Sequence, residues 1–385
     1  MRLHGPPGPP SSPERQTAPR HAGLDALRGA LAVWVVLHHT AITYGAIGGW
    51  YYRELPPDGG LASTLLVFFC TFNQAFFMGL FFLLAGYHTP AALARDGALR
   101  YLAGRGLRLG LPLLVYGLLL GPATIALAQT AHGRPFGATL LALWRKGTVE
   151  IGPLWFALAL LAFSLLAALW PGGWRAPAPA CASEPAAPPW PSDRALAWAA
   201  LATGAAALGL RQVWPVGHSV WGLQLGYFAS YTLLFAFGCA AAGPGWLTRL
   251  PAPRVRTWRR VAGLALPVLP LVYLALPGER SGGSRLLDIV YAFWEPAVAW
   301  GVIAVLLQRF RQPAGPPGAL WPVLGRRAYA VFIVHPPVVV AVALAWRAVP
   351  APALLKFAVT GALSVALCLL LAGALLRLPL LRRLL

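Results

Sequence analysis

Three ionisable side chains lie in one apolar stretch near the start of the sequence: Arg28, His38 and His39. An α-helix turns about 100° per residue, so the eleven steps from Arg28 to His39 turn roughly 1,100° and return to nearly the same face. His38 falls roughly 80° from that face. Imidazole is the side chain best suited to accept a proton near neutral pH, so His39 is a candidate general base, with Arg28 about 16 Å away along the helix. The alternative is that His39 only hydrogen-bonds a neighbouring helix.

The composition places the chain in the membrane class. Of its 385 residues, 58% are hydrophobic and only 11% are charged, which is too little polar surface for a soluble globule of this size. A net charge of +20 would suggest nucleic-acid binding in a soluble protein, but here the arginines flank apolar stretches, so we expect no nucleic-acid partner. The four cysteines show no paired or metal-ligand spacing, which predicts no disulfide and no metal site.

Ten apolar stretches are long enough, at about 20 residues each, to cross the hydrocarbon core of a bilayer. Their approximate limits are 26–46, 62–87, 107–129, 152–170, 195–213, 223–243, 259–277, 286–307, 325–346 and 353–376. The sequence therefore predicts an all-α, polytopic integral membrane helical bundle of about ten transmembrane helices. Residues 1–22 and 378–385 are expected to be tails, the first of them disordered, around a membrane domain at 23–377 with a flexible loop at 171–193.

The basic residues predict the orientation of the bundle. If both termini are cytoplasmic (N-in/C-in), 21 of the 31 Lys and Arg residues lie on the cytoplasmic side and nine lie outside, while Arg28 marks the inner end of the first span. Cytoplasmic connections carry an excess of positive charge. We therefore expect cytoplasmic tails and a multi-pass protein of the plasma or inner membrane.

Four further polar residues lie near the middle of other apolar stretches: Asn73, Gln74, Glu295 and His335. Polar groups at membrane depth are costly and usually face a cavity or a partner. Together with His39 they are predicted to line one polar cavity. The alternative is that each makes a separate interhelical hydrogen bond, typically worth ~0.6–2 kcal/mol.

Two of the candidates adjoin residues that interrupt helices. Pro336 and Pro337 follow His335 and are expected to break the helix and open a pocket there. Glu150 lies just before a Gly-Pro pair at the predicted outer surface, where an acceptor molecule can arrive. A solvated loop carboxylate is the alternative for Glu150.

Several motifs resemble those of the membrane acyltransferase 3 family, which includes polysaccharide O-acetylases and glucan succinyltransferases. The matches follow the family's order between about residues 21 and 377: Leu24-Asp25-Ala26-Leu27-Arg28-Gly29 with His39 after an arginine and ten residues, Phe81-Phe82-Leu83-Leu84-Ala85-Gly86-Tyr87, Arg105-Gly106-Leu107-Arg108 followed by Pro112, Gly152-Pro153-Leu154-Trp155-Phe156, and Ala328-Tyr329 with Val334-His335-Pro336. Ala85 and Ala328 stand where the family often has serine, so those hydroxyls are absent from this chain.

The resemblance implies an O-acyltransferase that moves an acyl group, acetyl or succinyl, from cytoplasmic acyl-coenzyme A to a hydroxyl, often on a glycan, without a permanently bound cofactor. His39 then either acts as the base or takes the acyl group itself, and the sequence leaves both routes open. Arg105 and Arg108, three residues apart, are the candidate clamp for the coenzyme A phosphates, with Arg28 as a third contact; alternatively, they only enforce topology. Trp155 is a further candidate for the substrate cavity.

A second class of protein also requires polar residues at mid-membrane. It comprises transporters and flippases of glycans or lipid-linked substrates. Such transporters commonly contain two related halves with matched broken helices. No convincing repeat relates residues 26–213 to residues 223–376. The sequence therefore favours the enzyme.

Overall fold

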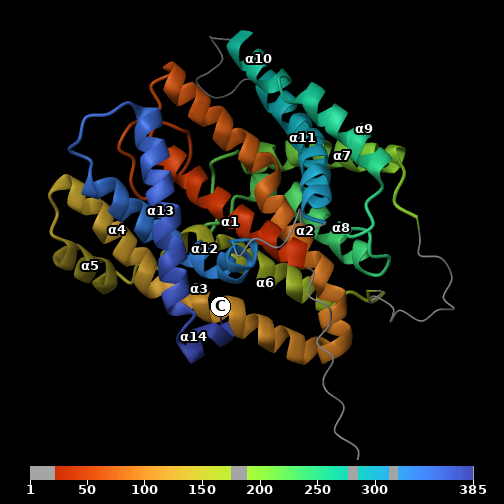
Figure 1. Ribbon diagram of the computed structural model, residues 1–385, viewed down its shortest axis with the longest axis horizontal. Helices are drawn as coiled ribbons and strands as arrows, with labels where there is room; N and C mark the ends of the chain where they lie inside the picture. The colour runs from red at the N-terminus through yellow and green to blue at the C-terminus, as the bar shows by residue number, and fades with distance from the viewer. Residues whose placement is uncertain (1–21, 175–188, 276–284, 312–319, 385) are drawn as a thin grey trace, which may run out of the picture.

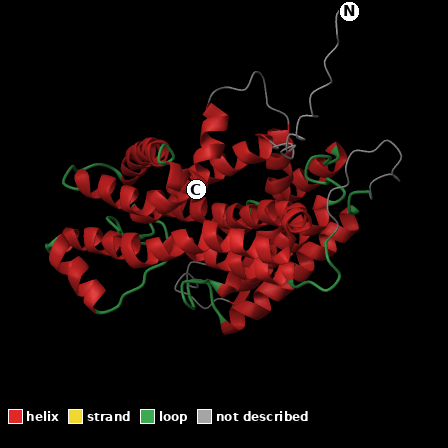
Figure 2. Cartoon of the chain, turned by 90° about the horizontal axis from the view of Figure 1, so that it is seen from below, coloured by secondary structure: helices red, strands yellow, loops and turns green. Residues whose placement is uncertain are grey.

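The computed structural model describes residues 22–174, 189–275, 285–311 and 320–384. These residues form helices and connecting loops, with two isolated β-bridges and no strand (Figure 2). The prediction of an all-α, polytopic membrane bundle is confirmed. Nearly all of the predicted tail 1–22 and most of the predicted loop 171–193 lie outside the described residues, while the C-terminal segment 378–385 contains a short helix, α14 (Pro379–Leu384).

The first half of the chain carries most of the candidate residues. Its helices are α1 (Ala22–Thr43), α2 (Leu61–Arg105), α3 (Leu111–Val115), α4 (Gly121–Gln129), α5 (Phe136–Arg145) and α6 (Trp155–Ala168). Two π-helical turns, Gly106–Gly110 and Tyr116–Leu120, connect α2, α3 and α4, and a 3-10 turn, Gly152–Leu154, leads into α6.

The second half surrounds α1 and α2. Its helices are α7 (Asp193–Val213), α8 (Phe228–Ala242), α9 (Ala252–Ala265), α10 (Val268–Ala275), α11 (Arg285–Arg311), α12 (Leu320–Ala345) and α13 (Ala353–Leu375). In Figure 1, α1 lies centrally in contact with α2 and α12; α7, α9 and α10 gather around α11 on one side, and α4, α5 and α13 lie on the other.

Eight helical stretches of the described residues are long and apolar enough to cross a membrane. One of them, Leu61–His132, is 72 residues long and covers two predicted spans, with non-helical backbone at Gly97 (φ 72°, ψ 162°) between them. The predicted span at 152–170 is a shorter apolar helix, Gly152–Ala168, and Pro267 separates α9 from α10 within the predicted seventh span. The number of ten crossings therefore stays a prediction.

Glycines bring α1 and α12 into close contact. A Cβ atom at Gly29 would lie 2.5 Å from the backbone carbonyl carbon of Leu324, and one at Gly325 would lie 2.8 Å from the carbonyl oxygen of Asp25. Small residues allow membrane helices to approach each other in this way. A side chain at either glycine would push the two helices apart.

The same contact sets the depth of two histidines. His39 follows Gly29 by ten residues, and His335 follows Gly325 by ten residues. Because the glycines meet and the histidines also meet, α1 and α12 run parallel. Ten residues of helix span about 15 Å, so both imidazoles lie at the same height above the glycine contact.

A second pair of glycines joins α2 to α8. A Cβ atom at Gly86 would lie 2.2 Å from the carbonyl oxygen of Phe235, and one at Gly238 would lie 2.2 Å from that of Leu83. The main hydrophobic core lies around this contact and includes buried residues of α1, α2, α6, α8 and α11. Through this core, α1 and α2 pack against α6, α8 and α11.

Helix α12 continues through Pro336 and Pro337, so the expected break after His335 is wrong. Proline lacks an N–H group and therefore removes one helical hydrogen bond, but neighbouring helices in a membrane bundle tolerate this. In α12 the packing against α1 and α13 keeps the helix intact.

The predicted orientation can be tested with reporter fusions. Because 21 of the 31 basic residues fall on one side, a reporter fused after Gly59 should report an outside location and one fused after Asp96 a cytoplasmic location. Gly59 lies in the loop between α1 and α2, and Asp96 lies next to the non-helical Gly97. The opposite pattern of reporter signals would reverse the assignment of every loop.

Candidate functional site

His39 of α1 faces His335 of α12. His335 Nε2 lies 3.0 Å from His39 Nδ1, and the two ring planes are inclined by 24° with their centroids 5.0 Å apart, so the rings meet through their nitrogen edges. His39 Nδ1 also lies 3.1 Å from the carbonyl oxygen of Val35, and His335 Nδ1 lies 2.7 Å from that of Phe332. The structure therefore brings together two of the residues that the sequence singled out.

The surrounding acceptors fix the hydrogen positions on both neutral imidazoles. Pro336 lacks the N–H that would bond to the Phe332 carbonyl four residues earlier, so His335 Nδ1–H donates to that oxygen instead. His335 Nε2 is then an acceptor. His39 Nδ1 faces two acceptors, His335 Nε2 and the Val35 oxygen, and must therefore carry its hydrogen. The lone pair of His39 lies on Nε2, which forms no hydrogen bond with a described residue.

Trp50, in the loop between α1 and α2, packs against both histidines. Its ring stacks on the His39 ring with centroids 4.1 Å apart and an angle of 16° between the planes. It is also nearly parallel to the ring of His335, at 5.9 Å. We call His39, His335 and Trp50 the histidine cluster.

His38 has different surroundings from its neighbour. It is buried, and its ring packs on Phe77 of α2 with centroids 4.9 Å apart. Its Nδ1 has no hydrogen-bond partner among the described residues. The contacts of His39 with two other rings of the cluster thus support the choice of His39 that the helical face had suggested.

Glu150 belongs to a hydrogen-bonded group beside the histidine cluster. Tyr51 Oη donates to Glu150 Oε1 at 3.3 Å and lies 3.1 Å from Tyr116 Oη, while the N–H of Gly152 donates to the same carboxylate oxygen at 2.8 Å. The ring of Tyr51 packs edge-on against Trp50. Burial raises the pKa of the Tyr51 phenol, so this loop residue stays a hydrogen-bond donor at neutral pH. The carboxylate of Glu150 is therefore held in place and not freely solvated.

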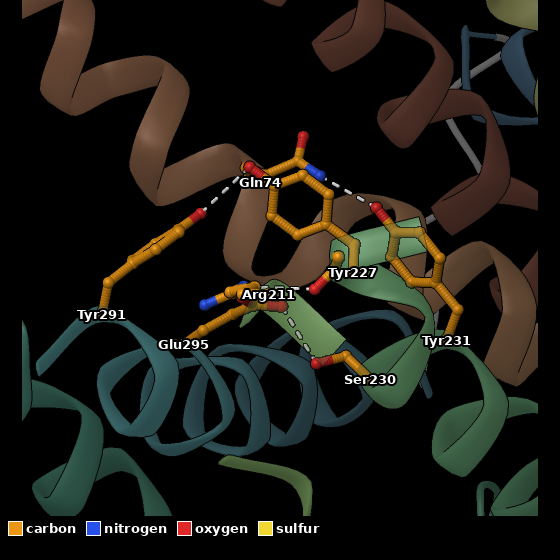
Figure 3. Close-up of polar contacts among 8 residues, drawn as sticks. Gln74, Arg211, Tyr227, Ser230, Tyr231, Tyr291 and Glu295 are labelled. Carbon is orange, nitrogen blue, oxygen red and sulfur yellow. Dashed lines mark hydrogen bonds and ion pairs between the residues drawn. The ribbon is translucent and has the colours of Figure 1, made fainter. Parts of the chain in front are cut away.

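Glu295 belongs to a second polar group, shown in Figure 3. Arg211, near the end of α7, forms a buried ion pair with Glu295 of α11, and the other carboxylate oxygen accepts a hydrogen bond from Ser230 Oγ at 2.9 Å. The guanidinium of Arg211 lies 5.3 Å from the ring centroid of Tyr227 and 4.7 Å from that of Tyr291. We call these residues the ion-pair group.

Gln74 and Trp155 adjoin the ion-pair group through Tyr231. Gln74 Nε2 donates to Tyr231 Oη at 2.8 Å (Figure 3), and the Tyr231 ring stacks on Trp155 with centroids 5.6 Å apart. Asn73 makes its contact elsewhere, because its Oδ1 accepts a hydrogen bond from Trp34 of α1. Adjacent residues of a helix point about 100° apart. The polar contacts of the five predicted residues thus fall into four sets: His39 with His335, Asn73 with Trp34, Gln74 with Tyr231, and Glu295 with Arg211 and Ser230.

The arginines lie at the opposite end of α1 from the histidine cluster. Arg28 pairs with Asp25 at 3.0 Å, and it is close enough to Arg105 for the two charges to interact. Arg105 is half-buried with its guanidinium 5.2 Å from the ring centroid of Tyr101, whereas Arg108 is exposed in a π-helical turn. A π turn contains more residues than an α turn, so the two side chains diverge further than α-helical spacing predicts. The structure thus separates the exposed Arg108 from the half-buried Arg105.

The sequence analysis missed Trp50, Tyr51 and Arg211, as well as the tyrosines and the serine around them: Tyr116, Tyr227, Ser230, Tyr231 and Tyr291. Trp50 and Tyr51 lie in an irregular loop with no periodic pattern. In the sequence, Arg211 is only one of the nine basic residues counted on the outer side. One signal was present for the pairing of the histidines. A glycine precedes His39 and His335 by the same ten residues, which is the spacing expected for two parallel helices in contact.

Comparison with known protein families gives an independent result. The model of a family described as an acyltransferase domain, acyltransferase 3, matches residues 21–373. The chain belongs to the acyltransferase 3 family. No curated protein and no solved structure matches it.

Membership of the acyltransferase 3 family confirms the resemblance of the motifs and makes the protein a membrane acyltransferase. The matched residues include the whole histidine cluster, the ion-pair group and all three candidate arginines. The family assignment also favours the enzyme over a transporter or flippase.

Proposed function

We propose that the protein transfers an acyl group, acetyl or succinyl, from cytoplasmic acyl-coenzyme A to a hydroxyl group of a glycan or another cell-envelope or secondary-metabolite acceptor, at the plasma or inner membrane. The proposal rests mainly on the lone pair of His39 Nε2, which is left available because Nδ1 donates to two acceptors. A hydroxyl must lose its proton as it attacks a thioester, and a neutral imidazole oriented in this way can accept that proton.

In the direct route, the acceptor oxygen bonds to the thioester carbonyl carbon while His39 Nε2 takes its proton. The tetrahedral intermediate then breaks its C–S bond, and the sulfur leaves with the proton from Nε2 as the coenzyme A thiol. His335 is a positioning residue, because its Nε2 accepts the Nδ1–H of His39 and stabilises the imidazolium that forms.

In the second route, His39 Nε2 attacks the thioester carbon itself, and the acceptor hydroxyl then cleaves the resulting acyl-imidazole. The same lone pair serves both routes. A single-turnover reaction with acyl-labelled donor and no acceptor distinguishes them, because label bound to His39 occurs only in the second.

The donor phosphates are assigned to the arginines at the other end of α1. Coenzyme A carries its phosphates and its sulfur at opposite ends of an extended arm. Arg28 and His39 are eleven residues apart on α1, which corresponds to about 16 Å. Guanidinium groups of Arg28 and Arg105 can bind phosphate oxygens through paired hydrogen bonds, and the arm then leads along α1 toward His39.

Removing the side chain of Arg105 should weaken donor binding. A charge-assisted hydrogen bond is worth roughly 1.5–3 kcal/mol, so Arg105→Ala should lower the affinity for acyl-coenzyme A on the order of ten- to a hundred-fold. Arg108→Ala should have a smaller effect, because Arg108 is exposed on a diverging turn. Arg105→Lys should rescue binding only in part, since it keeps the charge and loses the planar fork.

Arg100→Ala serves as the matched control for this binding measurement. It removes an exposed positive charge from the same helix, α2, five residues before Arg105. If arginines in this region only enforce topology, Lys restores full function at position 105 and the Ala variants insert poorly. Unchanged donor affinity in well-inserted Arg105→Ala protein would exclude the phosphate contact.

The acceptor side is assigned to the group around Glu150. Tyr51 and Glu150 form hydrogen bonds next to Trp50, so a hydroxyl that reaches His39 passes close to them. Trp155 and Gln74 are tied into the aromatic packing around Tyr231, which suits a supporting wall better than a direct substrate contact.

Mass spectrometry of surface glycans and lipids tests the proposed activity. The measurement compares cells that carry the gene, cells that lack it and cells that carry His39→Ala. We expect one acceptor to lose the mass of one acyl group in the last two, which identifies the acyl group and the acceptor together. Identical acceptor masses in all three would refute the proposed acyl transfer.

A further inference from the structure

Trp50 has a buried donor that is not used within the protein. Its indole Nε1 has no hydrogen-bond partner among the described residues, although the ring is packed against His39 and His335. Buried N–H groups are almost always paired in folded proteins, because an unpaired group loses its hydration without compensation. A buried unpaired donor in contact with a candidate base therefore calls for an explanation.

The chemistry of Trp50 Nε1 distinguishes it from the unpaired ring nitrogen of His38. His38 Nδ1 is also unpaired, but a neutral imidazole can present either a donor or a lone pair at that position. An indole nitrogen is only a donor. Trp50 Nε1 can therefore be satisfied only by an acceptor atom that enters the site, and a carbonyl oxygen is such an atom.

The loop that carries Trp50 is held firmly at both of its ends. The N–H groups of Glu54 and Leu55 both donate to the carbonyl oxygen of Thr43 at the end of α1, at 2.9 and 3.2 Å. Glu54 also forms an ion pair with the buried Lys356 of α13. A donor fixed in this way needs little reorganisation during a reaction, which is the property that makes such donors effective in catalysis.

We infer that Trp50 Nε1–H is the donor that stabilises the oxyanion during acyl transfer, an inference that rests on the proposed function. When the attacking oxygen bonds to the thioester carbon and its proton passes to His39 Nε2, the carbonyl π electrons move to the carbonyl oxygen. Trp50 Nε1–H donates a hydrogen bond to that negative oxygen. The carbonyl re-forms as the C–S bond breaks, and the thiol leaves with the proton from His39.

The substitution Trp50→Phe tests the inference, because it keeps an aromatic ring and removes the N–H. Loss of one oxyanion donor typically lowers kcat by about 10²–10³. We expect a fall of this size in kcat, measured as thiol release, with KM for the donor and the acceptor little changed. Wild-type kcat, or a change confined to KM, would show that Trp50 only packs against His39 and would overturn the inference.

A second replacement keeps the test decisive if phenylalanine disturbs the fold. Benzothienylalanine at position 50 preserves the bicyclic shape and has sulfur in place of the N–H, so it should show the same loss of kcat. The matched control is Trp34→Phe, which removes a part-buried indole N–H that already has a partner, Asn73, within the protein. This control should retain nearly full kcat.

The outcomes separate this inference from the proposed function. Thiol release that requires His39 and persists without the Trp50 N–H refutes only the role of Trp50. Absence of thiol release in the wild-type protein refutes the proposed function itself, whatever the behaviour of the Trp50 variants.

Discussion

Replacing His39 with alanine is expected to abolish acyl transfer while the protein remains folded in the membrane. A positioned general base typically contributes a factor of about 10²–10⁴ to the rate. His39 is the residue whose orientation the structure fixes, through the acceptors at Val35 and His335. The measurement is thiol release per amount of correctly inserted protein, because a lower yield of protein would otherwise resemble a catalytic loss.

His38→Ala is the matched control for this experiment. It removes an adjacent imidazole at the same depth, but one that packs on Phe77 and lacks the contact with His335. We expect measurable activity in this variant. An inactive His38→Ala protein together with an active His39→Ala protein would show that the assignment based on the helical face and the hydrogen bonds is wrong.

A large loss of stability is expected when only one partner of the Arg211–Glu295 ion pair is removed. The side chains of the two residues are 4% and 1% exposed, so a single substitution leaves a buried charge without its partner. Such changes typically destabilise by about 3–5 kcal/mol. Glu295→Leu and Arg211→Met should therefore each lower the Tm of the purified protein and its yield in the membrane.

The double variant Arg211→Met/Glu295→Leu provides the control. Replacing both charges by apolar groups of similar size is often neutral or stabilising, so the double variant should have a higher Tm than either single variant. The contradicting outcome is a single variant that keeps the wild-type Tm and loses only acyl transfer. It would make the ion-pair group part of the reaction site, in agreement with the predicted common cavity that includes His39.

Helix content and membrane class follow from the sequence because they depend on local properties. Apolar stretches of about 20 residues are visible without tertiary information, and the described helices follow most of the predicted spans. The effect of Pro336 and Pro337 was harder to predict, since a proline breaks a helix only where neighbouring helices do not support it. Here α1 packs along α12 and the helix continues.

The candidate site was only partly predictable for a related reason. His39 and His335 were identified as polar residues in apolar surroundings, and their equal spacing from Gly29 and Gly325 is a pattern in the sequence. Which polar residues share a contact depends on helix rotation and packing, so the sequence did not indicate that Gln74 contacts Tyr231 or that Glu295 pairs with Arg211. Trp50 lies in a loop whose course is set by tertiary hydrogen bonds and by the Glu54–Lys356 ion pair, and no local pattern reports these.

The central claim is that His39 acts in acyl transfer from acyl-coenzyme A. It either accepts the proton of the attacking hydroxyl or takes the acyl group itself. Its most direct test is the appearance of free coenzyme A thiol when purified protein in vesicles is supplied with acetyl- or succinyl-coenzyme A and an extract of the cell envelope as acceptor. We expect wild-type protein to release thiol in proportion to the acyl groups found on the acceptor, and His39→Ala to release almost none. Equal thiol release by both proteins, or movement of a glycan across the vesicle membrane without any thiol release, would contradict it.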